Sequence, residues 1–241
     1  MKRRLVVIPT YNEAGNIKSL IDQLFATIPE CEIMVVDDGS PDGTALICKA
    51  LSQENKRLHL IERHTKSGIG SAYRMAFIWA LEQNFDEVIE MDADGSHQVS
   101  DLLRMLDTKT MNPEVDLVIG SRWIRGGKTV NWSRSRELLS RIANRYVRIM
   151  LGMGIHDATA GFRIYSSRIL RKIDLGHIRS EGYSFQIEMT RAAYKAGAVI
   201  VEIPITFKER ENGVSKMSKK IVREAIFLVT AWGVKRILRI K

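Results

Sequence analysis

The 241-residue chain has few cysteines and no long apolar segment. Its two cysteines, Cys31 and Cys48, match no metal-ligand spacing, so the sequence argues against both a disulfide framework and a zinc site. No window holds the roughly 18 uncharged apolar residues that a membrane-spanning helix needs. The first apolar run, Leu5 to Ile8, is also too short for a signal peptide. These absences predict a cytoplasmic globular protein that is soluble or lies on a membrane surface.

Two common nucleotide-binding motifs are incomplete. The segment SGIGSA at 67–72 lies between an expected strand and an expected helix, but it lacks the third glycine of a dinucleotide-binding fingerprint. The segment RWIRGGKT at 122–129 ends like a P-loop, but Arg122 occupies the position of its first glycine. No Ser/His/Asp arrangement and no catalytic histidine is recognisable either. The sequence therefore argues against hydride transfer and against P-loop nucleotide hydrolysis.

The net charge of +9 is concentrated in two segments. Residues 122–148 contain eight Arg and Lys against one acid, and residues 216–241 also contain eight against one. Concentrated positive charge indicates a polyanionic partner such as nucleic acid, acidic lipid or a phosphate-rich substrate, although two solvated helix faces would show the same pattern. A nucleic-acid partner is not expected, because no RNA- or DNA-binding motif is recognisable and the acidic motifs of the chain would have no role.

The first 120 residues alternate between apolar segments and segments with helical spacing. The expected strands cover residues 4–9, 31–37, 58–63, 85–92 and 116–122, and the expected helices cover 14–28, 43–54, 71–84 and 100–109. Strands that are apolar throughout and separated by helices are typical of a mostly parallel sheet with helices on both faces. In such α/β folds, ligands bind beyond the carboxyl ends of the strands.

The alternation stops after residue 122. A basic helix is expected at 135–152, a loop at 157–165, a helix at 185–197 and a strand at 199–207. No internal repeat or low-complexity linker interrupts the chain. We therefore expect one domain over residues 1–215, followed by a basic amphipathic helix over residues 216–241.

Acidic residues follow three of the expected strands, in PTYNE at 9–13, VVDDGSPDGT at 35–44 and MDADGSH at 91–97. Each motif is consistent with a polar turn that caps the next helix. Asp92 and Asp94, however, follow their strand at i and i+2, so both carboxylates can converge on one point and would repel each other without a cation. Two carboxylates, completed by water and phosphate oxygens, suit Mg²⁺ or Mn²⁺. His97 is either a further ligand or a polar residue at the start of the next helix.

The C-terminal basic segment is amphipathic over 217–241. Six apolar residues share one helical face, namely Ile221, Val222, Ala225, Ile226, Val229 and Trp232, while Lys220 and Arg223 oppose them. Phe227 and Val234 fall on the polar side, so burial of one face alone would leave apolar surface exposed. The uncharged run 225–234 extends only ~15 Å as a helix, which is too short to span a bilayer. The sequence predicts a helix that lies on an anionic membrane surface or docks against the domain.

Taken together, these motifs resemble those of family 2 glycosyltransferases, which have the GT-A fold, a Rossmann-like α/β fold with a mostly parallel sheet. PTYNE, VVDDGSPDGT, MDADGSH and the GSR at 120–122 carry this resemblance. The segment GSRWIRGGKTVNWSRSRELLSRIANRY, followed by DATAGFRIY, is similar to that of the dolichyl-phosphate and polyprenyl-phosphate mannose synthases. The resemblance covers nearly the whole chain. It implies a GT-A domain, which the basic amphipathic segment follows.

The resemblance implies a set of metal-binding and donor-binding residues. Asp92 and Asp94 match a DXD motif that binds Mg²⁺ or Mn²⁺, and Ser96 stands where some members have a glutamine ligand. The positions that match contacts to the nucleotide of GDP-mannose are Pro9, Tyr11, Glu13, Val35, Asp37 and Ala93. Arg210 and Lys216 match basic residues that close over the donor diphosphate.

The resemblance also implies an acceptor site and a reaction. Arg122, Arg136 and Ser140 match residues that hold the phosphate of a polyprenyl (dolichyl-type) monophosphate, and Asp94 and both arginines would carry the reaction. Because a phosphate monoester is already ionised at neutral pH, it needs no general base, and we expect inverting transfer of mannose in a single displacement. Transfer of glucose or another sugar to the same lipid is the alternative. A peripheral protein on the cytoplasmic face of a membrane is expected, with or without a separate membrane anchor protein.

Overall fold

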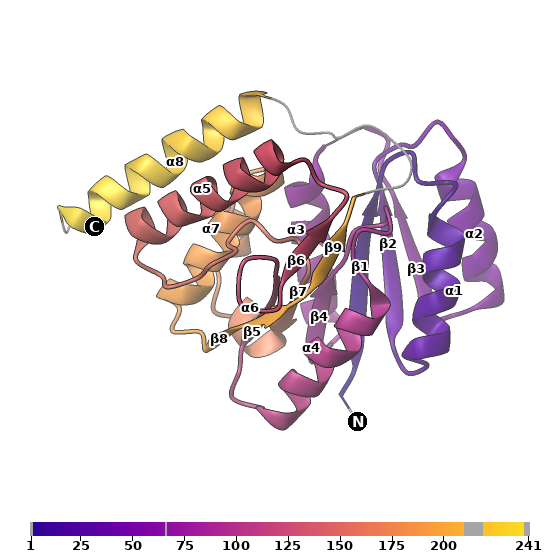
Figure 1. Ribbon diagram of the computed structural model, residues 1–241. Coiled ribbons are helices and arrows are strands. Elements are labelled where there is room, and N and C mark those ends of the chain that lie inside the picture. The colour runs from indigo at the N-terminus through magenta and orange to yellow at the C-terminus, as the bar shows by residue number, and fades with distance from the viewer. Residues whose placement is uncertain (1, 66, 210–218, 239–241) are drawn as a thin grey trace.

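The computed structural model describes residues 2–65, 67–209 and 219–238, which form an α/β fold around a seven-stranded sheet (Figure 1). The strand order is β3-β2-β1-β4-β7-β5-β8. In chain order, these strands span Arg4–Thr10 (β1), Glu32–Asp37 (β2), Leu58–Glu62 (β3), Glu87–Glu90 (β4), Leu117–Ser121 (β5), Arg163–Ser166 (β7) and Ile200–Pro204 (β8). Only β7 runs antiparallel to its neighbours, β4 and β5. The predicted mostly parallel sheet is therefore confirmed.

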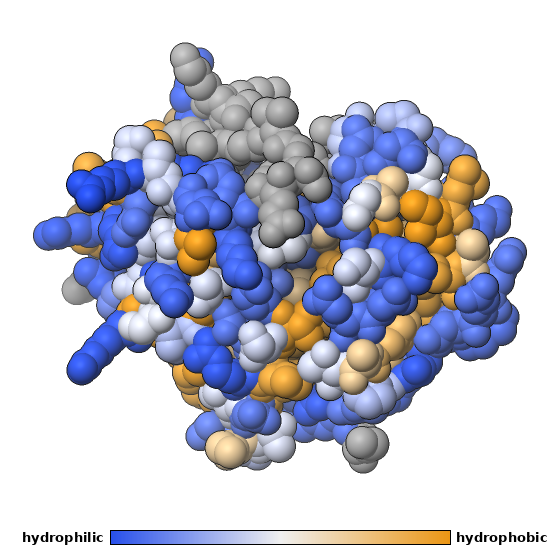
Figure 2. Space-filling view, turned by 45° about the vertical axis from the view of Figure 1, so that its right-hand side comes forward, coloured by the Kyte–Doolittle hydropathy of each residue, from blue (hydrophilic) through white to orange (hydrophobic). Residues whose placement is uncertain are grey.

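Helices cover both faces of this sheet (Figure 1). One face packs against α1 (Ile17–Thr27), α2 (Thr44–Glu54) and α4 (Val99–Met111), and the other against α3 (Ile69–Glu82), α6 (Ser167–Leu170) and α7 (Gly182–Lys195). On the α7 side, α5 (Arg134–Leu151) and α8 (Lys219–Ile237) pack against each other, and a short 3-10 helix, η1 (Leu175–His177), precedes α7. Figure 2 is turned toward the α1–α2 side, where mostly hydrophilic surface surrounds bands of apolar residues.

The strands divide their side chains between two hydrophobic cores, because successive residues of a strand point to opposite faces. In β1, Leu5 and Val7 face the core with α3 and α7, whereas Val6 and Ile8 face the core with α1, α2 and α4. All four side chains are 0% exposed. Burial of one such side chain contributes roughly 1.5–3 kcal/mol. Strands buried on both faces explain the continuous apolar runs in the sequence.

Two segments differ from the sequence-based expectation. The expected loop at 157–165 contains the start of β7, a strand of only four residues that has no apolar run of its own. The expected strand at 199–207 is divided in two, because Pro204 ends β8 and the chain then turns into β9 (Thr206–Lys208). β9 pairs in parallel with β6 (Lys128–Val130), which forms a second, two-stranded sheet. This small sheet places the start of the basic segment beside the chain that follows β8.

The C-terminal helix α8 is docked on the domain. Val229 is 1% exposed and belongs to the core on the α7 side. The hydroxyl groups of Tyr146 and Thr230 lie 2.7 Å apart, and Arg236 Nε donates a hydrogen bond to the carbonyl oxygen of Met150 (2.9 Å). Within the part of the chain that the structure describes, no helix is long and apolar enough to cross a membrane.

The strand order brings two of the predicted motifs together. β1 and β4 are parallel neighbours, and the chain leaves β1 for β2 on one side and returns to β4 on the other. The order of the strands therefore reverses between β1 and β4, which is where open α/β sheets bind their ligands. The loops at 11–16 and 91–98 follow these two strands.

Arg163 of β7 is fully buried and holds the loop at 157–162 against α7. Its guanidinium donates hydrogen bonds to the carbonyl oxygens of Ala158 (2.8 Å), Ala160 (2.7 Å) and Gln186 (3.1 Å) and to the hydroxyls of Tyr165 (3.1 Å) and Thr190 (2.9 Å). Glu90 lies 4.0 Å away, and burial raises the pKa of its carboxyl to about 7, although Arg163 and Gln186 act to lower it.

Replacing Arg163 with Met should lower the free energy of unfolding by about 3 kcal/mol, because its buried acceptors would lose their donor. Urea unfolding at neutral pH measures this change. Arg171→Met is the control, since Arg171 is exposed and its hydrogen bond to the Leu81 carbonyl (3.2 Å) lies at the surface; its effect should stay within about 0.5 kcal/mol. A similar, small effect of both substitutions would contradict a structural role for the Arg163 hydrogen bonds.

Candidate active site

Asp37, the last residue of β2, connects the loops that follow β1 and β2. Its Oδ1 accepts hydrogen bonds from the hydroxyls of Thr10 (2.8 Å) and Ser40 (2.6 Å), and its Oδ2 accepts one from the Ser40 backbone N–H (2.8 Å). The Ser40 hydroxyl also accepts a hydrogen bond from the backbone N–H of Asn12 (2.9 Å), which has a φ of 58°. Asp37 is 1% exposed, so its carboxylate fixes the shape of both loops.

A second carboxylate, Asp42, ties the same two loops together. It accepts hydrogen bonds from the backbone N–H of Ala14 (3.0 Å) and from the backbone N–H (3.1 Å) and hydroxyl (2.6 Å) of Thr44. Burial acts to raise the pKa of Asp42, but these hydrogen bonds outweigh burial, and the pKa is lowered. The Glu13 backbone N–H donates to the Thr44 hydroxyl (3.0 Å), which anchors the buried Glu13 in the same unit.

Besides Glu13 and Asp37, four residues were expected to contact the nucleotide, and they differ in exposure. Pro9 and Tyr11 are partly exposed at the end of β1. Val35 and Ala93 are instead 0% and 3% exposed and belong to the core on the α1–α2 side. Their side chains therefore pack in the core beneath the loops that follow β2 and β4.

Asp38 extends this loop system to the segment before α3. Its carboxylate pairs with Arg63 and accepts a hydrogen bond from the backbone N–H of Gly68 (3.2 Å). Arg63 in turn donates to the Gly68 carbonyl oxygen (2.9 Å). The role of Asp38 was not predicted from the sequence, because Asp38 and Gly68 are 30 residues apart.

Strand β4 ends at Glu90, and Asp92 and Asp94 lie in the loop that follows it. The chain bends here instead of continuing as an extended strand, and Gly95 has a φ of 74°. Asp94 accepts a hydrogen bond from the Ser96 backbone N–H (3.1 Å), and the Asp92 backbone N–H donates to Nδ1 of His97 (3.1 Å). A turn, and not the alternation of an extended strand, therefore positions the two carboxylates.

His97 supports this turn from inside the protein. It is 4% exposed, and its ring stacks on Phe162 with the centroids 4.6 Å apart and meets Phe207 edge-on at 5.5 Å. Burial lowers the pKa of His97 to about 4, although Asp94 acts to raise it. The ring is therefore neutral, with Nδ1 accepting the Asp92 N–H and Nε2 lying 3.9 Å from Asp92 Oδ2. This arrangement favours the second expected role of His97, a polar residue that shapes the turn.

The loop offers three oxygen-bearing side chains to a cation, those of Asp92, Asp94 and Ser96. The Ser96 hydroxyl is buried and has no hydrogen-bond partner within the described residues, so its oxygen is available to a ligand. Across residues 2–65, 67–209 and 219–238, no three His, Cys, Asp or Glu side chains are grouped to hold a metal ion by themselves. The residues present therefore fit a hard divalent cation such as Mg²⁺ or Mn²⁺ that takes its remaining ligands from water and a diphosphate.

Arg122 and Asp157 form a buried ion pair at the end of β5. Arg122 Nε and Nη2 each lie 2.7 Å from one Asp157 oxygen, and the Arg122 backbone N–H donates to the same carboxylate (3.0 Å). The side chains are 5% and 0% exposed. Burial acts to lower the pKa of Arg122 and to raise that of Asp157, but each opposite charge outweighs burial, so the pKa of Arg122 is raised and that of Asp157 is lowered. Both groups therefore stay charged.

Thr159 links this ion pair to α5. Its hydroxyl accepts hydrogen bonds from Arg122 Nη2 (3.0 Å) and Asn144 Nδ2 (3.0 Å) and donates one to Asp157 Oδ1 (3.2 Å). Asn144 also donates to the carbonyl oxygen of Ser140 (3.1 Å), one turn earlier in α5. Two of the predicted acceptor residues, Arg122 and Ser140, are thus connected through Thr159 and Asn144.

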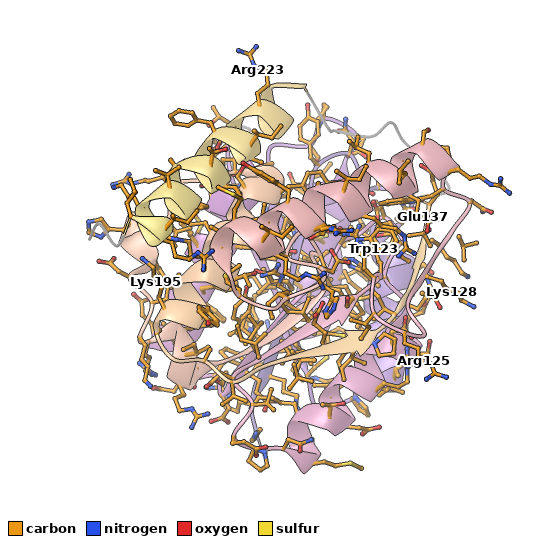
Figure 3. The ribbon with its side chains drawn as sticks, turned by 60° about the vertical axis from the view of Figure 1, so that its left-hand side comes forward. Trp123, Arg125, Lys128, Glu137, Lys195 and Arg223 are labelled. Carbon is orange, nitrogen blue, oxygen red and sulfur yellow. The ribbon has the colours of Figure 1, made fainter. Side chains whose placement is uncertain are left out.

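An aromatic cluster surrounds the Arg122 guanidinium. Its Cζ lies 5.3 Å from the ring centroid of Trp123 and 5.4 Å from those of Trp132 and Phe207. Arg136 Cζ lies 4.0 Å from the ring centroid of Trp132, so both arginines predicted to hold the acceptor phosphate contact one indole. Figure 3 shows this side of the molecule, with Trp123 beside α5. Phe207 contacts Trp132 and His97, which places the cluster next to the acidic loop.

Arg136 forms an ion pair with Glu209. The side chains are 25% and 36% exposed, so this pair is far more solvated than Arg122–Asp157. Arg136 lies in the first turn of α5, where the Ser133 hydroxyl accepts its backbone N–H (3.3 Å). Glu209 follows β9, and its backbone N–H donates to the carbonyl oxygen of Val130 (2.9 Å).

Other predicted and unpredicted residues complete this region. Arg210 and Lys216, expected to close over the diphosphate, lie outside the described residues. Gly161 faces the acidic loop, since a Cβ at this position would lie 3.8 Å both from Asp92 Oδ2 and from Gln186 Nε2. Seven residues of this region were not predicted from the sequence, namely Asp157, Thr159, Asn144, Trp132, Glu209, Gly161 and Gln186. An acid in DATAGF after a basic helix signals a charge partner, but Arg122 and Asp157 are 35 residues apart.

Comparisons with known proteins agree with these observations. The sequence family described as Glycosyl transferase family 2 matches residues 5–174. Polyprenol monophosphomannose synthase of Mycolicibacterium smegmatis is 47% identical over 235 residues, which cover 97% of this chain and 88% of that protein. Undecaprenyl-phosphate mannosyltransferase of Micrococcus luteus is 48% identical over 231 residues, which cover 96% and 94%.

Solved structures show a similar fold. Glucosyl-3-phosphoglycerate synthase from Mycobacterium tuberculosis, in complex with Mn²⁺, UDP-glucose and phosphoglyceric acid, has a TM-score of 0.70 at 18% identity, with 97% of this chain and 80% of that chain covered. The same protein in complex with Mn²⁺, UDP and phosphoglyceric acid has a TM-score of 0.72 at 18% identity, with 96% and 78% covered. At this level of identity, the likeness concerns the fold alone.

Asp157→Asn should lower the free energy of unfolding at neutral pH by about 3 kcal/mol, because it leaves the buried Arg122 without a counter-charge. The folded-state pKa of Asp157 lies below its ordinary value of 3.8, so the ion pair contributes fully above that pH and is lost as the pH falls through the folded-state pKa. Urea unfolding of both proteins from about pH 7 down to about pH 3 should therefore show a difference that shrinks at the acid end. A difference that stays constant over this range would contradict the assignment.

Proposed function

Because the chain belongs to glycosyltransferase family 2 and has the GT-A fold that its sequence predicts, we propose that it is a polyprenyl-phosphate mannosyltransferase. The proposed reaction converts GDP-mannose and a polyprenyl monophosphate to polyprenyl phosphomannose and GDP. The observation that carries this proposal is the meeting of Arg122 and Arg136 at Trp132, next to the acidic loop after β4. The names of relatives at 47% and 48% identity support mannose as the sugar and a polyprenyl phosphate as the acceptor, and GDP as the carrier of mannose rests on the family resemblance.

On the donor side, Asp92, Asp94 and Ser96 would hold Mg²⁺ or Mn²⁺. When bound, such a cation supplies positive charge that stabilises the leaving diphosphate. The loops joined by Asp37 and Asp42 would receive the nucleotide at the end of β1, because their hydrogen bonds fix the loops before any ligand binds. Arg210 and Lys216 are proposed to add positive charge at the diphosphate, as the family resemblance implies.

On the acceptor side, Arg122 and Arg136 would orient the lipid phosphate, with Ser140 one turn further along α5. An oxygen of the phosphate monoester bonds to C1 of mannose while the bond from C1 to the GDP oxygen breaks, and that electron pair leaves with GDP. The configuration at C1 inverts in this single displacement. No proton has to be removed from the nucleophile, which agrees with the engagement of His97 Nδ1 by the Asp92 backbone N–H.

Transfer of glucose or another sugar to the same lipid phosphate is the second candidate. The solved glucosyl-3-phosphoglycerate synthase contains UDP-glucose, but it shares only 18% identity with this chain and bears on the fold alone. The relatives at 47% and 48% identity are named for mannose, which favours the first candidate. A panel of nucleotide sugars against polyprenyl phosphate distinguishes the two candidates, and GDP-mannose is the donor expected to react.

Transfer from GDP-mannose should stop with EDTA and return with added Mg²⁺ or Mn²⁺. Asp92→Asn should lower kcat/KM by more than about 100-fold, because the cation site loses one of its carboxylates. The midpoint of thermal unfolding should not change. Asp22→Asn is the control, since Asp22 is exposed on α1 and pairs with Lys18; its activity should stay within about two-fold of wild type.

Three results would contradict this proposal. EDTA-resistant transfer would remove the role of the cation. Preference for UDP-glucose over GDP-mannose would favour the second candidate. A trapped mannosyl-enzyme, or retention of configuration at C1, would rule out the single displacement.

We propose that α5 and α8 rest on an anionic membrane surface on its cytoplasmic face. On α5, Leu138, Ile142 and Ile149 form one ridge and are 59%, 57% and 61% exposed, and the exposed Arg141 and Arg145 flank them. Such a helix suits the boundary between acyl chains and acidic head groups. The sequence predicted a basic helix here but not its apolar ridge.

The outer side of α8 has the same character. Val229 docks the helix, while four apolar side chains of α8 are 43–73% exposed, namely Ile226, Phe227, Val234 and Ile237, and Leu238 directly after the helix is 60% exposed. The face with Val229 docks against the domain, and we propose that the opposite face takes the other role considered from the sequence, contact with the membrane surface. α5 and α8 lie side by side, and Figure 3 labels Arg223 and Lys195 on this side of the molecule.

Replacing Leu138 and Ile142 together with Ser should weaken binding to anionic vesicles about ten-fold or more, because two inserted side chains lose their apolar contact. Flotation of the purified protein with anionic and with neutral vesicles measures this. Leu46→Ser is the control, since Leu46 is 72% exposed on α2, across the sheet. Wild-type protein that does not float with anionic vesicles would instead favour a separate membrane anchor protein.

A further inference from the structure

We propose that Glu209 competes with the acceptor phosphate for Arg136 and thereby sets the affinity of the protein for polyprenyl phosphate. This inference rests on the proposed function, because it takes Arg136 as part of the acceptor site. It gives a role to a carboxylate that the reaction itself does not need, at a position where a negative charge would otherwise only oppose a phosphate.

The two arginines of the acceptor site hold their carboxylate partners differently. Arg122 makes two side-chain hydrogen bonds of 2.7 Å to Asp157, and these side chains are 5% and 0% exposed. Arg136 contacts Glu209 through one nitrogen and one oxygen, and these side chains are 25% and 36% exposed. A solvated pair with a single contact is weak and exchanges readily, whereas a buried bidentate pair does not. The Arg136–Glu209 pair is therefore the one that a phosphate opens.

Glu209 is kept beside Arg136 by the backbone around it. Its N–H donates to the carbonyl oxygen of Val130 (2.9 Å), and the N–H of Lys208 donates to the carbonyl oxygen of Ser96 (3.1 Å). The N-cap hydroxyl of α5 likewise accepts the backbone N–H of Arg136 (3.3 Å). Because both backbones are anchored, the carboxylate stays at a high effective concentration near the guanidinium. Exchange of the ion pair then needs only side-chain rotation.

The charges of substrate and product make this competition useful. A phosphate monoester carries about −1.5 to −2 at neutral pH, whereas the phosphodiester of polyprenyl phosphomannose carries only one negative charge. A carboxylate therefore yields Arg136 to the acceptor more readily than to the product. Once mannose is attached, Glu209 takes Arg136 back and promotes release of the product. Removal of the carboxylate should strengthen the binding of both.

Glu209→Gln removes the charge and keeps the size of the side chain. With a short, water-soluble polyprenyl monophosphate as acceptor, KM should fall about two- to five-fold, the range of one solvated ion pair. Inhibition by polyprenyl phosphomannose should tighten at least as much, and kcat should not rise. Glu209→Asp keeps the charge but shortens the reach, so it should lower KM as well and serves if Glu209→Gln does not fold.

Glu137→Gln is the matched control. Glu137, which is labelled in Figure 3, follows Arg136 on α5. Its side chain is 36% exposed like that of Glu209, and it pairs with Arg141 instead. This substitution removes one negative charge from the same region without opening the Arg136–Glu209 pair. The acceptor KM should therefore stay within about two-fold of wild type.

Each remaining outcome overturns the inference in a distinguishable way. An unchanged or raised acceptor KM in both Glu209 variants, in an enzyme that transfers mannose to polyprenyl phosphate, overturns it and leaves the proposed function intact. Equal falls in KM for Glu209→Gln and Glu137→Gln overturn it too, because net charge alone would account for them. A wild-type protein that transfers no mannose to any polyprenyl phosphate removes the proposed function and this inference with it.

Discussion

The buried ion pair of Arg122 and Asp157 is the constraint on which the rest of the acceptor side depends. A guanidinium that is 5% exposed persists in the interior only if a carboxylate meets it with good geometry. That carboxylate has supports of its own, because Glu202 of β8 accepts the Asp157 backbone N–H (2.9 Å) and Thr159 connects the pair to α5. One charge requirement thus joins β5, β8, α5 and the loop before β7. The Arg122 guanidinium is therefore fixed before any ligand binds, so little reorganisation accompanies binding.

The two arginines at Trp132, Arg122 and Arg136, differ in how far they are removed from water. The buried Asp157 neutralises one edge of the Arg122 guanidinium and stays bound to it, so Arg122 keeps a fixed position in the site. Arg136 faces water at the first turn of α5, where the helix dipole adds to its attraction for anions. Similar residues on one indole therefore provide a rigid contact and an adjustable one. A lipid phosphate that arrives from the side of α5 and α8 meets both.

The sequence predicted the parts of this molecule that depend on local pattern. Apolar runs between helices identified the sheet, and acids at strand ends identified the loops after β1, β2 and β4. Contacts between distant segments had no such signature: Glu209 is 73 residues from Arg136. The sequence also did not show which matched residues are exposed, since Val35 matches a nucleotide-binding position yet its side chain lies wholly in the core. A turn at Gly95 replaced the expected extended strand. It is held by hydrogen bonds that involve Ser96 and His97, and the His97 ring is in turn packed against Phe162 and Phe207, which are distant along the chain.

The antiparallel strand β7 gives the chain a length constraint. Ile164 pairs with Ile89 on one side and Val118 on the other, which places Arg163 on the α7 side of the sheet. A slip of one residue would turn Arg163 toward the opposite core and move the preceding loop by about 3.3 Å along the strand. The number of residues between Asp157 and Arg163 is therefore as important as their identity. Inserting one residue at 158–162 would separate the Asp157 carboxylate from Arg122 while every residue of the site was still present.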